Sequence, residues 1–353
     1  MLSRNSQIPL YVQLADCLRE QIRSGEIKEG DKLPSETEMI KYYQLGRLTI
    51  RDALDILVHE GLLEKRHGKG TFCRTNFVQK KYRVDVFLNL AEVEFIPYYL
   101  RSICAVLESE NVNIVMGDTK NDPNMICNLL ENSLLDGSNG IIFQPANADE
   151  NASEKICDVL NRLTEKNVPY VMIDTFYRNV PESYVVMDEF QAGKIAADYF
   201  VQMGHTKLCA IEHQNRLDSM GRIKGLIAGL ENEPKIIEYS KNLKTALEST
   251  LKENKDITGI FCFNDGVAKK CYDILSSMQI SIPDEMSVIS VDDTIVASTL
   301  SPSLTSVIHP KEHLGRDAAK AILSMISGES LFPYKKVFQP TIAIRKSCCE
   351  CKK

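Results

Sequence analysis

Four polar side chains follow short apolar runs in the second half of the chain, where their chemistry suits a polyhydroxylated ligand. Asp174 ends the run VPYVMID, and Asn264 follows GIFCF. Arg222 lies in SMGRIKG, shortly after KLCAI, and Asp292 follows MSVISV. Carboxylate, amide and guanidinium groups can accept from and donate to several hydroxyls at once, as a sugar requires. An Asp or Asn after a strand can equally cap the next helix, so each position alone also fits a structural role.

A second group of polar side chains lies near the amino terminus, on a segment with helical spacing. Arg47 and Arg51 are one helical turn apart and therefore share a face, with Thr49 beside them. Arg is the commonest side chain that reads guanine in the major groove, and Thr can bond a base or a phosphate. On this segment alone, a DNA-reading helix and a solvated amphipathic helix are equally good interpretations.

The segment LLEKRHGKGTFCR, which follows this helix, favours the DNA-reading interpretation. It predicts two short strands, residues 62–65 and 71–73, joined by a turn that contains two glycines. Glycine permits a positive φ at such a turn. His67, Gly68 and Lys69 occupy the turn, which is basic as a whole. A basic hairpin after a recognition helix is typical of a DNA-binding wing.

Three predicted helices position these groups in the head of the chain. Apolar residues at every fourth position predict a helix over residues 9–24. Ser35 and Glu38 have the S-x-x-E spacing of a capping box, which predicts where a second helix begins. In the third helix, apolar side chains recur at helical spacing from Ile50, and Gly61 ends it.

Residues 9–72 resemble the DNA-binding domain of the GntR family. The motifs PLY, LPSE, R-x-T-I-R-x-A-L, EGLL and GKGTF occur in the family's order and spacing. The resemblance implies a winged helix-turn-helix domain over residues 1–77 that binds double-stranded operator DNA. It assigns DNA contact to Ser35, Thr37, Arg47, Thr49, Arg51, His67, Gly68 and Lys69.

Two positions depart from the GntR pattern. Gly46 stands where the family usually has Ser or Thr, which removes a helix cap worth roughly 1 kcal/mol and a phosphate contact. Thr37 stands where many members have Arg. Both departures leave the operator half-site open without affecting the expected fold.

From Val84 onwards, short β-branched runs alternate with helical segments. Such alternation predicts an α/β architecture with two parallel sheets covered by helices. In these folds ligands bind beyond the carboxyl ends of the strands. The expected strands are VDVFLNL, NIVMG, GIIFQP, VPYVMID, KLCAIE, GIFCF and MSVISV, and the expected helices cover 96–111, 151–166, 189–203, 265–279 and 311–327.

Residues 84–345 resemble the effector domain of the LacI/GalR family, which is similar to periplasmic sugar-binding proteins. The segments FNDGVAKKCYDIL, IPDEMSVISVDD and LTSVIHPKEHLGRDAAKAIL are the most specific. We therefore expect a linker over 78–83, with Lys80, Lys81 and Arg83 near phosphate, and a sugar-binding and dimerisation domain over 84–353. The resemblance implies that the sugar is hydrogen-bonded by Asp174, Arg222, Asn264 and Asp292. It offers Phe95 and Phe143 as an apolar face, although ordinary core packing explains both equally well, and Asp188 and Gly193 as structural residues.

A GntR-type head on a LacI-type body resembles the family of bacterial arabinose repressors. TKNDPNM at 119–125 and LTSVIHPKEHLG at 304–315 extend this resemblance. It implies a homodimeric repressor that L-arabinose releases from its operator. An activator, or the same architecture with another pentose or hexose, fits the residues nearly as well.

Charge is distributed unevenly along the chain. Residues 1–83 hold 15 basic and 11 acidic side chains, whereas the remainder holds 27 basic and 37 acidic ones. Only the first part therefore suits a polyanionic partner. The polar start and the lack of 18 consecutive apolar residues predict a cytoplasmic protein without membrane contact, which argues against a transport binding protein.

The remaining chemistry-bearing residues indicate no enzyme. G-x-S-x-G, a P-loop, H-E-x-x-H and a Schiff-base lysine context are missing, so we expect no catalytic residue and no cofactor. Most of the eleven cysteines lie singly in apolar runs, where reduced, buried thiols are expected. Cys348, Cys349 and Cys351 could bind a metal, but no spaced Cys or His pair completes a set, so no metal is expected.

Overall fold

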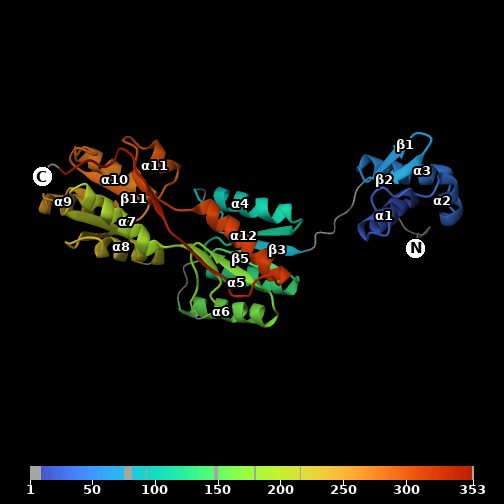
Figure 1. Ribbon diagram of the computed structural model, residues 1–353, viewed down its shortest axis with the longest axis horizontal. Helices are drawn as coiled ribbons and strands as arrows, with labels where there is room; N and C mark the ends of the chain where they lie inside the picture. Colours follow the sequence, from blue (N-terminus) through green and yellow to red (C-terminus); the bar gives the residue numbers. More distant parts are fainter. Residues whose placement is uncertain are drawn as a thin grey trace. The chain divides into compact units, whose positions relative to one another are not determined.

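The computed structural model describes residues 9–74, 82–92, 94–146, 150–178, 180–214 and 216–351. The chain divides into two compact units, a head over Met1–Lys81 and a body over Tyr82–Lys353 (Figure 1). Within the described ranges, none of the helices combines the length and apolar character that crossing a bilayer requires.

The described part of the head contains three helices and a hairpin, as predicted. Ser35 caps the second helix through a capping box with Glu38, and Gly46 precedes the third without a side-chain cap. Gln44 adopts a left-handed conformation with φ 51°, which makes the tight turn between these two helices. The elements are α1 (Leu10–Arg23), α2 (Glu36–Tyr43), α3 (Arg47–His59), β1 (Leu63–Arg66) and β2 (Gly70–Cys73).

The hairpin is fixed to the helices by one further strand contact. Arg66 pairs with Gly70 at the tip of the antiparallel hairpin, and Lys32 forms a bridge to Phe72. Gly68 and Gly70 have φ of 70° and 117°, which explains why the tip contains glycine. A buried core of α1 and α3 side chains supports this arrangement, including Leu14, Leu18, Ile50, Leu54 and Leu57.

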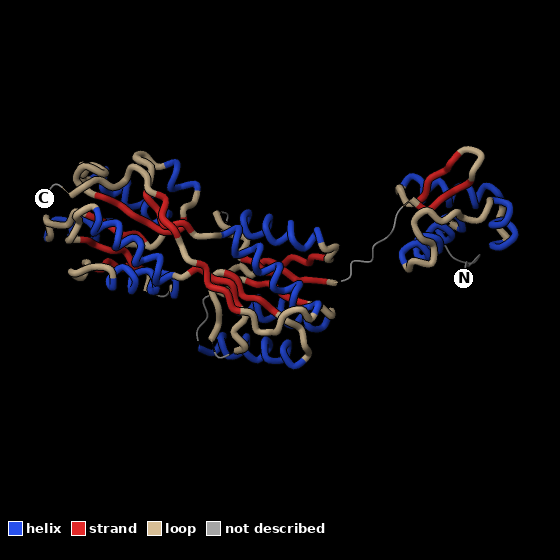
Figure 2. The backbone as a smooth tube through the Cα atoms, in the orientation of Figure 1, coloured by secondary structure: helices blue, strands red, loops and turns tan. Residues whose placement is uncertain are grey.

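The body confirms the predicted α/β class, because it contains two six-stranded sheets flanked by helices (Figure 2). The amino-terminal lobe has the strand order β13-β7-β6-β5-β3-β4, and the carboxy-terminal lobe has β14-β12-β11-β10-β8-β9. All neighbouring strands are parallel except β12 and β14.

Each lobe alternates strands and helices along the chain. The amino-terminal lobe comprises β3 (Arg83–Leu88), α4 (Ile96–Ser109), β4 (Asn113–Asp118), α5 (Pro123–Leu135), β5 (Gly140–Phe143), α6 (Glu150–Glu165), β6 (Tyr170–Ile173), β7 (Tyr184–Met187), α12 (Lys311–Ser327) and β13 (Lys335–Phe338). The carboxy-terminal lobe comprises α7 (Glu189–Gln202), β8 (Leu208–Glu212), α8 (Leu217–Ala228), β9 (Lys235–Glu238), α9 (Leu243–Glu253), β10 (Gly259–Cys262), α10 (Asp265–Ser277), β11 (Ser287–Asp292), α11 (Ile295–Thr299), β12 (Thr305–Ile308) and β14 (Thr341–Ala343).

The chain passes between the lobes three times, after β7, after β12 and after β13. Asp188 joins the first and third passages. Its backbone amide donates to Phe338 O at 2.9 Å, and its carboxylate accepts from Gln339 Nε2 at 3.3 Å. The same carboxylate caps α7 through the amide of Gln191, which accords with the structural role expected for this residue.

Helices α7 and α8 lie side by side at unusually close range, because glycine allows their backbones to touch (Figure 1). A Cβ at Gly193 would lie 1.7 Å from Arg222 O, and one at Gly225 would lie 1.8 Å from Phe190 O. This packing sets Glu189, at the start of α7, against Arg222 on α8.

We expect Gly193→Ala to force the two helices apart. The overlap with a backbone oxygen should lower the free energy of unfolding by about 1–3 kcal/mol and weaken ligand binding through the displaced Arg222. Urea unfolding followed by circular dichroism measures the first effect. Gly266→Ala in α10 is the matched control, because its Cβ would meet only Asn264 Oδ1, at 3.6 Å. Equal stability of the Gly193 variant and the unchanged chain would contradict this account.

Candidate functional site

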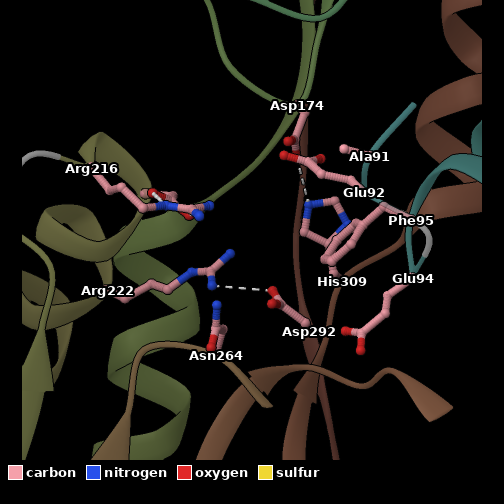
Figure 3. A pocket seen from close by; sticks show the side chains of 11 residues that line it. Ala91, Glu92, Glu94, Phe95, Asp174, Arg216, Arg222, Asn264, Asp292 and His309 are labelled. Carbon is pink, nitrogen blue, oxygen red and sulfur yellow. Dashed lines mark hydrogen bonds and ion pairs between the residues drawn. The ribbon is translucent and has the colours of Figure 1, made fainter. Parts of the chain in front are cut away.

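A cavity of about 320 Å³ lies between the two lobes of the body, where side chains from both converge (Figure 3). The four polar residues singled out in the sequence all line it, and so does Phe95. The structure therefore brings together side chains that lie up to almost 200 positions apart in the chain. The complete lining is Ala91, Glu92, Glu94, Phe95, Asp174, Arg216, Asp218, Arg222, Asn264, Asp292 and His309.

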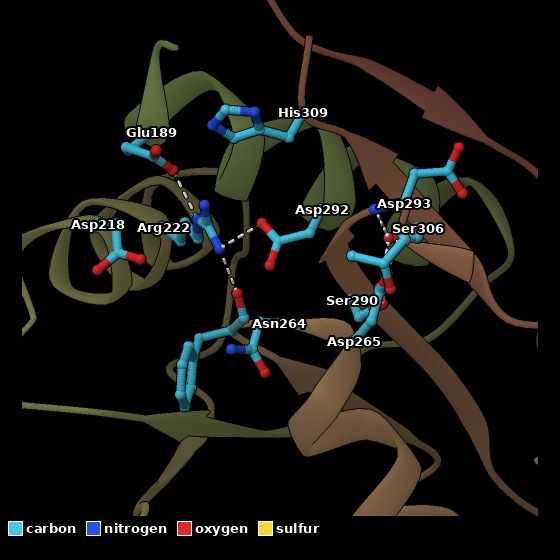
Figure 4. A network of polar contacts seen from close by, with 12 residues as sticks. Glu189, Asp218, Arg222, Asn264, Asp265, Ser290, Asp292, Asp293, Ser306 and His309 are labelled. Atoms are coloured by element: carbon cyan, nitrogen blue, oxygen red, sulfur yellow. Dashed lines mark hydrogen bonds and ion pairs between the residues drawn. The ribbon is translucent and has the colours of Figure 1, made fainter. Parts of the chain in front are cut away.

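Arg222 is the centre of the carboxy-terminal wall. It is only 3% exposed, and Figure 4 shows its guanidinium between two carboxylates. Nε donates to Glu189 Oε2 at 2.6 Å, and Nη1 lies 3.1 Å from Asp292 Oδ1. Nη1 also donates to the backbone oxygen of Phe263 at 2.6 Å. The guanidinium is thus fixed in position before any ligand binds.

The two carboxyl groups beside Arg222 are strongly perturbed. Burial raises the pKa of Asp292 to about 7, although the Arg222 charge acts in the opposite direction. Burial also raises the pKa of Glu189 to about 7, again against Arg222. Beyond its ion pair with Arg222, Asp292 Oδ1 accepts no hydrogen bond from the described part of the chain. A ligand hydroxyl could occupy this vacant acceptor position.

Asp174 forms the opposing wall, from the amino-terminal lobe. It has a φ of 78°, which turns the chain sharply after β6. Its Oδ1 accepts from Tyr99 Oη at 3.1 Å and lies 3.0 Å from His309 Nε2, and its Oδ2 accepts from Gln144 Nε2 at 3.2 Å. Burial opposes ionisation, but the hydrogen bond from His309 lowers the pKa of Asp174. The side chain is therefore an ionised acceptor.

Glu92 stands beside Asp174 and shares a partner with it. Gln144 Nε2 donates to Glu92 Oε2 at 2.9 Å, and Asn89 Nδ2 donates to Oε1 at 3.2 Å. Burial raises the pKa of Glu92, and the nearby Asp174 charge adds to the shift. The Gln144 amide therefore bridges the two neighbouring carboxyl groups that line the cavity.

Arg216 and Asp218 form a bidentate pair at the mouth of the cavity. Arg216 Nη2 and Nε donate to the two Asp218 oxygens at 2.7 and 3.1 Å. Burial opposes the shift, but the Arg222 charge and the Arg216 hydrogen bonds hold the pKa of Asp218 far below its usual range. Both side chains are charged, and each can form a further hydrogen bond with a sugar hydroxyl.

Asn264 caps a helix and also lies in the lining of the cavity. Its Oδ1 accepts from the amide of Val267 at 2.9 Å and so caps α10, while its amide lines the cavity (Figure 3). Phe95 packs edge-on against His309 at 5.4 Å between centroids and presents an apolar surface to the cavity.

Phe143 was wrongly grouped with the ligand residues. It is fully buried in the core of the amino-terminal lobe, where its ring stacks on Tyr177 at 6.5 Å and contacts Tyr170. It is not part of the cavity lining. The strand GIIF is buried on both faces, so its last aromatic residue turns into the core rather than towards the cleft.

Several lining residues were missed by the sequence argument. Arg216 and Asp218 follow the run KLCAIE, and His309 follows LTSVI, so the same rule of polar residues after strands could have found all three. Glu92 and Glu94 lie on a loop after β3 that carries no distinctive pattern.

The head exposes most of the residues expected to contact DNA. Arg47 and Arg51 project from the first turns of α3, and His67, Gly68 and Lys69 form the exposed tip between β1 and β2. Arg51 Nε lies 3.6 Å from Glu36 Oε1 in a pair that leaves its side chain 57% exposed. Thr49 is half-buried on α3, and Ser35 and Thr37 are exposed at the start of α2. The Ser35 hydroxyl already forms the hydrogen bonds of the capping box, to the side chain and the backbone amide of Glu38.

Of the three basic residues expected near phosphate beside the linker, only Arg83 lies among the described residues. Lys80 and Lys81 lie outside the described residues. Arg83 is the first residue of β3 and binds Asp85 at 2.8 Å and Asp136 at 3.2 Å. These ion pairs weigh against its predicted role beside phosphate, because its guanidinium already has carboxylate partners inside the amino-terminal lobe.

Comparison with known families matches the two parts of the chain to two descriptions. Residues 10–73 match the bacterial regulatory proteins of the gntR family. Residues 197–348 match a periplasmic binding protein-like domain.

Relatives that match nearly the whole chain share both parts. An arabinose metabolism transcriptional repressor from Halalkalibacterium halodurans is 30% identical over 95% of each chain. One from Geobacillus stearothermophilus is 28% identical over 98% of this chain and all of its own. The body also has the fold of a LacI family transcriptional regulator from Enterococcus faecalis with bound ribose, with a TM-score of 0.64 at 21% identity, over 76% of this chain and 100% of that one.

Substitution of Asp292 should change how stability depends on pH. Its raised pKa means that the native state holds a proton that the unfolded chain, with a pKa near 3.9, releases. Because only the unfolded chain ionises at this position, the free energy of unfolding falls as the pH rises from about 4 to about 7. In Asp292→Asn this loss is removed, so the variant should gain on the unchanged chain by up to about 1 kcal/mol per pH unit between pH 5 and 7.

Urea unfolding at pH 5, 6, 7 and 8 measures this difference. Asp256→Asn, at an exposed position in the same lobe, is the control and should give a difference that does not vary with pH. A difference for Asp292→Asn that is equally flat would rule out a buried, proton-holding Asp292.

Proposed function

The chain belongs to the family of the arabinose metabolism transcriptional repressors, which are DNA-binding regulators with a sugar effector domain, and on that premise we propose a specific cycle for it. The head binds operator DNA as one half of a homodimer. L-Arabinose enters the cavity between the lobes of the body and releases the dimer from the operator. The chain acts as a regulator and catalyses no reaction.

The charge of the cavity is the observation that supports a neutral sugar. Five carboxyl groups line it against two guanidinium groups. Burial raises the pKa of Asp292 and of Glu92, but the ionised Asp174 and Asp218 offset both guanidinium charges, so the lining offers no net positive charge to a phosphorylated or carboxylated ligand. Phe95 is the one large aromatic ring in the described lining, which gives a planar base no pair of surfaces to stack between. Many fixed acceptors and donors with one apolar wall match a small polyol.

The distribution of the lining over both lobes supports a coupling mechanism. Asp174 and Glu92 come from the amino-terminal lobe, whereas Arg222 and Asp292 come from the carboxy-terminal lobe. A sugar that hydrogen-bonds both walls is bound more tightly when the lobes close, so it shifts the population towards the closed form. The three passages between the lobes are the elements that would bend.

Release from DNA then follows from linkage. If closure changes the spacing of two heads in a dimer, the heads no longer fit two half-sites of the operator at once. Because coupling between two ligands is reciprocal, operator DNA must weaken sugar binding by the same factor as sugar weakens DNA binding.

The direct experiment combines calorimetry with gel shift on the full chain. L-Arabinose, D-xylose, D-ribose and D-galactose are titrated against the protein, and each is then added to the protein–operator complex. We expect L-arabinose to bind most tightly and to release the operator. Binding of none of the four sugars, or retention of the operator complex at saturating L-arabinose, would overturn the proposal.

Arg47→Ala should impair operator binding while sugar binding persists. Loss of one Arg contact to a base typically costs about 1–3 kcal/mol, so each head should lose about 5- to 150-fold in affinity. Gel shift measures the loss, and calorimetry with L-arabinose shows that the body is intact. Lys28→Ala, a substitution of an exposed head lysine outside α3 and the hairpin, is the control and should bind the operator normally. Unchanged operator binding by the Arg47 variant would remove α3 as the recognition helix.

Asp174→Asn should impair sugar binding and leave operator binding intact. The amide keeps the shape of the side chain but loses the charge that His309 and Tyr99 stabilise, so sugar affinity should fall by about 10- to 150-fold. Operator binding without sugar should stay the same, and release by sugar should need correspondingly more ligand. Asp136→Asn, on the surface of the same lobe, is the matched control. A sugar affinity equal to that of the unchanged chain would exclude Asp174 from the ligand set.

A further inference from the structure

A second cavity, of about 570 Å³, lies within the carboxy-terminal lobe and shares no lining residue with the cavity between the lobes. It lies beyond the carboxyl ends of β8 and β9, beside α9 and α10. In parallel α/β sheets this edge is where ligands bind. We call it the lysine pocket, after Lys241, Lys244 and Lys270 in its lining.

The lysine pocket is basic, in contrast to the sugar cavity, where carboxyl groups outnumber guanidinium groups. Against its three lysines, Asp273 is the single carboxylate of the described lining. Within the described ranges, neither Lys241 nor Lys270 has a carboxylate within 4.0 Å, and Lys244 has only Glu248, at 3.9 Å. Lys270 Nζ donates a hydrogen bond to the neutral Tyr239 hydroxyl, which leaves its charge uncompensated. Ammonium groups that no close carboxylate neutralises attract anions, and lysine is a common ligand for phosphate.

Two further features shape the pocket for more than a simple ion. The Tyr239 ring is half-buried in the lining, with Lys270 Nζ 4.8 Å from its centroid, so a basic group and an aromatic face adjoin. Asn242, the residue before α9, makes no side-chain hydrogen bond to the first turn of this 11-residue helix. The amides of that turn add to the positive potential beside Lys241 and Lys244.

We propose that the lysine pocket binds a small phosphorylated sugar, with the phosphate on the lysines and the sugar ring against Tyr239. The volume falls within the range of known small-molecule sites, about 300–1,000 Å³. The protein thus has one cavity for a neutral sugar and another for an anionic one.

The lysine pocket is connected to the sugar cavity by direct contacts. His213 lines the lysine pocket, and its backbone oxygen accepts from the amide of Arg216 at 3.0 Å, so a single turn joins it to a residue of the sugar cavity. The rings of His213 and Tyr239 contact Phe263 at 6.0 and 5.7 Å between centroids. The backbone oxygen of Phe263 in turn holds Arg222.

A ligand against Tyr239 and His213 therefore acts on the segments that hold both guanidinium groups of the sugar cavity. Occupancy of the lysine pocket should change sugar affinity, and the reverse should hold to the same degree. This coupling rests on the proposed sugar-binding function, whereas binding in the lysine pocket does not.

Calorimetry on the full chain tests the binding directly, with D-ribose 5-phosphate, inorganic phosphate and D-ribose as probes. We expect D-ribose 5-phosphate to bind about tenfold or more tightly than either of the other two, because only it offers both charge and ring. The double variant Lys241→Gln/Lys270→Gln should bind it about tenfold or more weakly. Lys252→Gln, on α9 and 71% exposed outside the pocket, should bind it as the unchanged chain does.

Asp174→Asn separates the two cavities, because it should leave the affinity for D-ribose 5-phosphate unchanged. The second measurement repeats the L-arabinose titration with D-ribose 5-phosphate saturating, where we expect sugar affinity to change by about threefold or more. If no tested sugar binds but D-ribose 5-phosphate still binds through the lysines, the proposed function fails and the lysine pocket stands. No binding of D-ribose 5-phosphate, equal binding of inorganic phosphate, or full affinity in the double lysine variant would overturn the lysine pocket.

Discussion

Burial of the Arg222 charge is the constraint on which the ligand cavity depends. A guanidinium that is 3% exposed is tolerated only when carboxylates and carbonyls surround it, and Glu189, Asp292 and the Phe263 backbone supply them. Glu189 can reach it only because α7 and α8 touch through glycine. The close packing of two helices thus decides where the charge lies, and the charge decides where Asp292 and the β10–α10 loop lie.

The cavity is pre-organised but chemically incomplete. His309 Nδ1 is buried and forms no hydrogen bond with any described residue, at a cost of about 1–3 kcal/mol, and Asp292 Oδ1 has only its ion pair with Arg222. A ligand that satisfies them recovers part of this cost, whereas one that lacks hydroxyls at these places does not. The side chains that define the cavity, including Asp174 with its three partners, are held by contacts that need no ligand. Specificity therefore comes from rigid polar groups that can still form hydrogen bonds with a ligand.

The sequence predicted what depends on local periodicity and on strand ends. The capping box of Ser35, the hairpin and all seven apolar runs of the body appear where they were expected. Asp174, Arg222, Asn264 and Asp292 were found because parallel strands deliver their ends to one edge. Edge strands such as β9 and β13 were missed, because exposed polar side chains obscure the pattern there. Phe143 and Glu92 were misjudged or missed, since only tertiary packing decides which way a strand-end aromatic or a loop carboxylate points.

The different balance of charge in the two cavities of the body has a physical consequence for selection between ligands. A phosphorylated sugar meets no surplus of positive charge in the cavity between the lobes, because the ionised Asp174 and Asp218 offset its two guanidinium groups. A neutral sugar does not compensate the charges of Lys241 and Lys270, neither of which has a carboxylate within 4.0 Å among the described residues. Each cavity therefore discriminates against the ligand of the other by its electrostatic potential rather than by its shape. Because one turn, from His213 to Arg216, borders both, the carboxy-terminal lobe can respond to two chemically related ligands without confusing them.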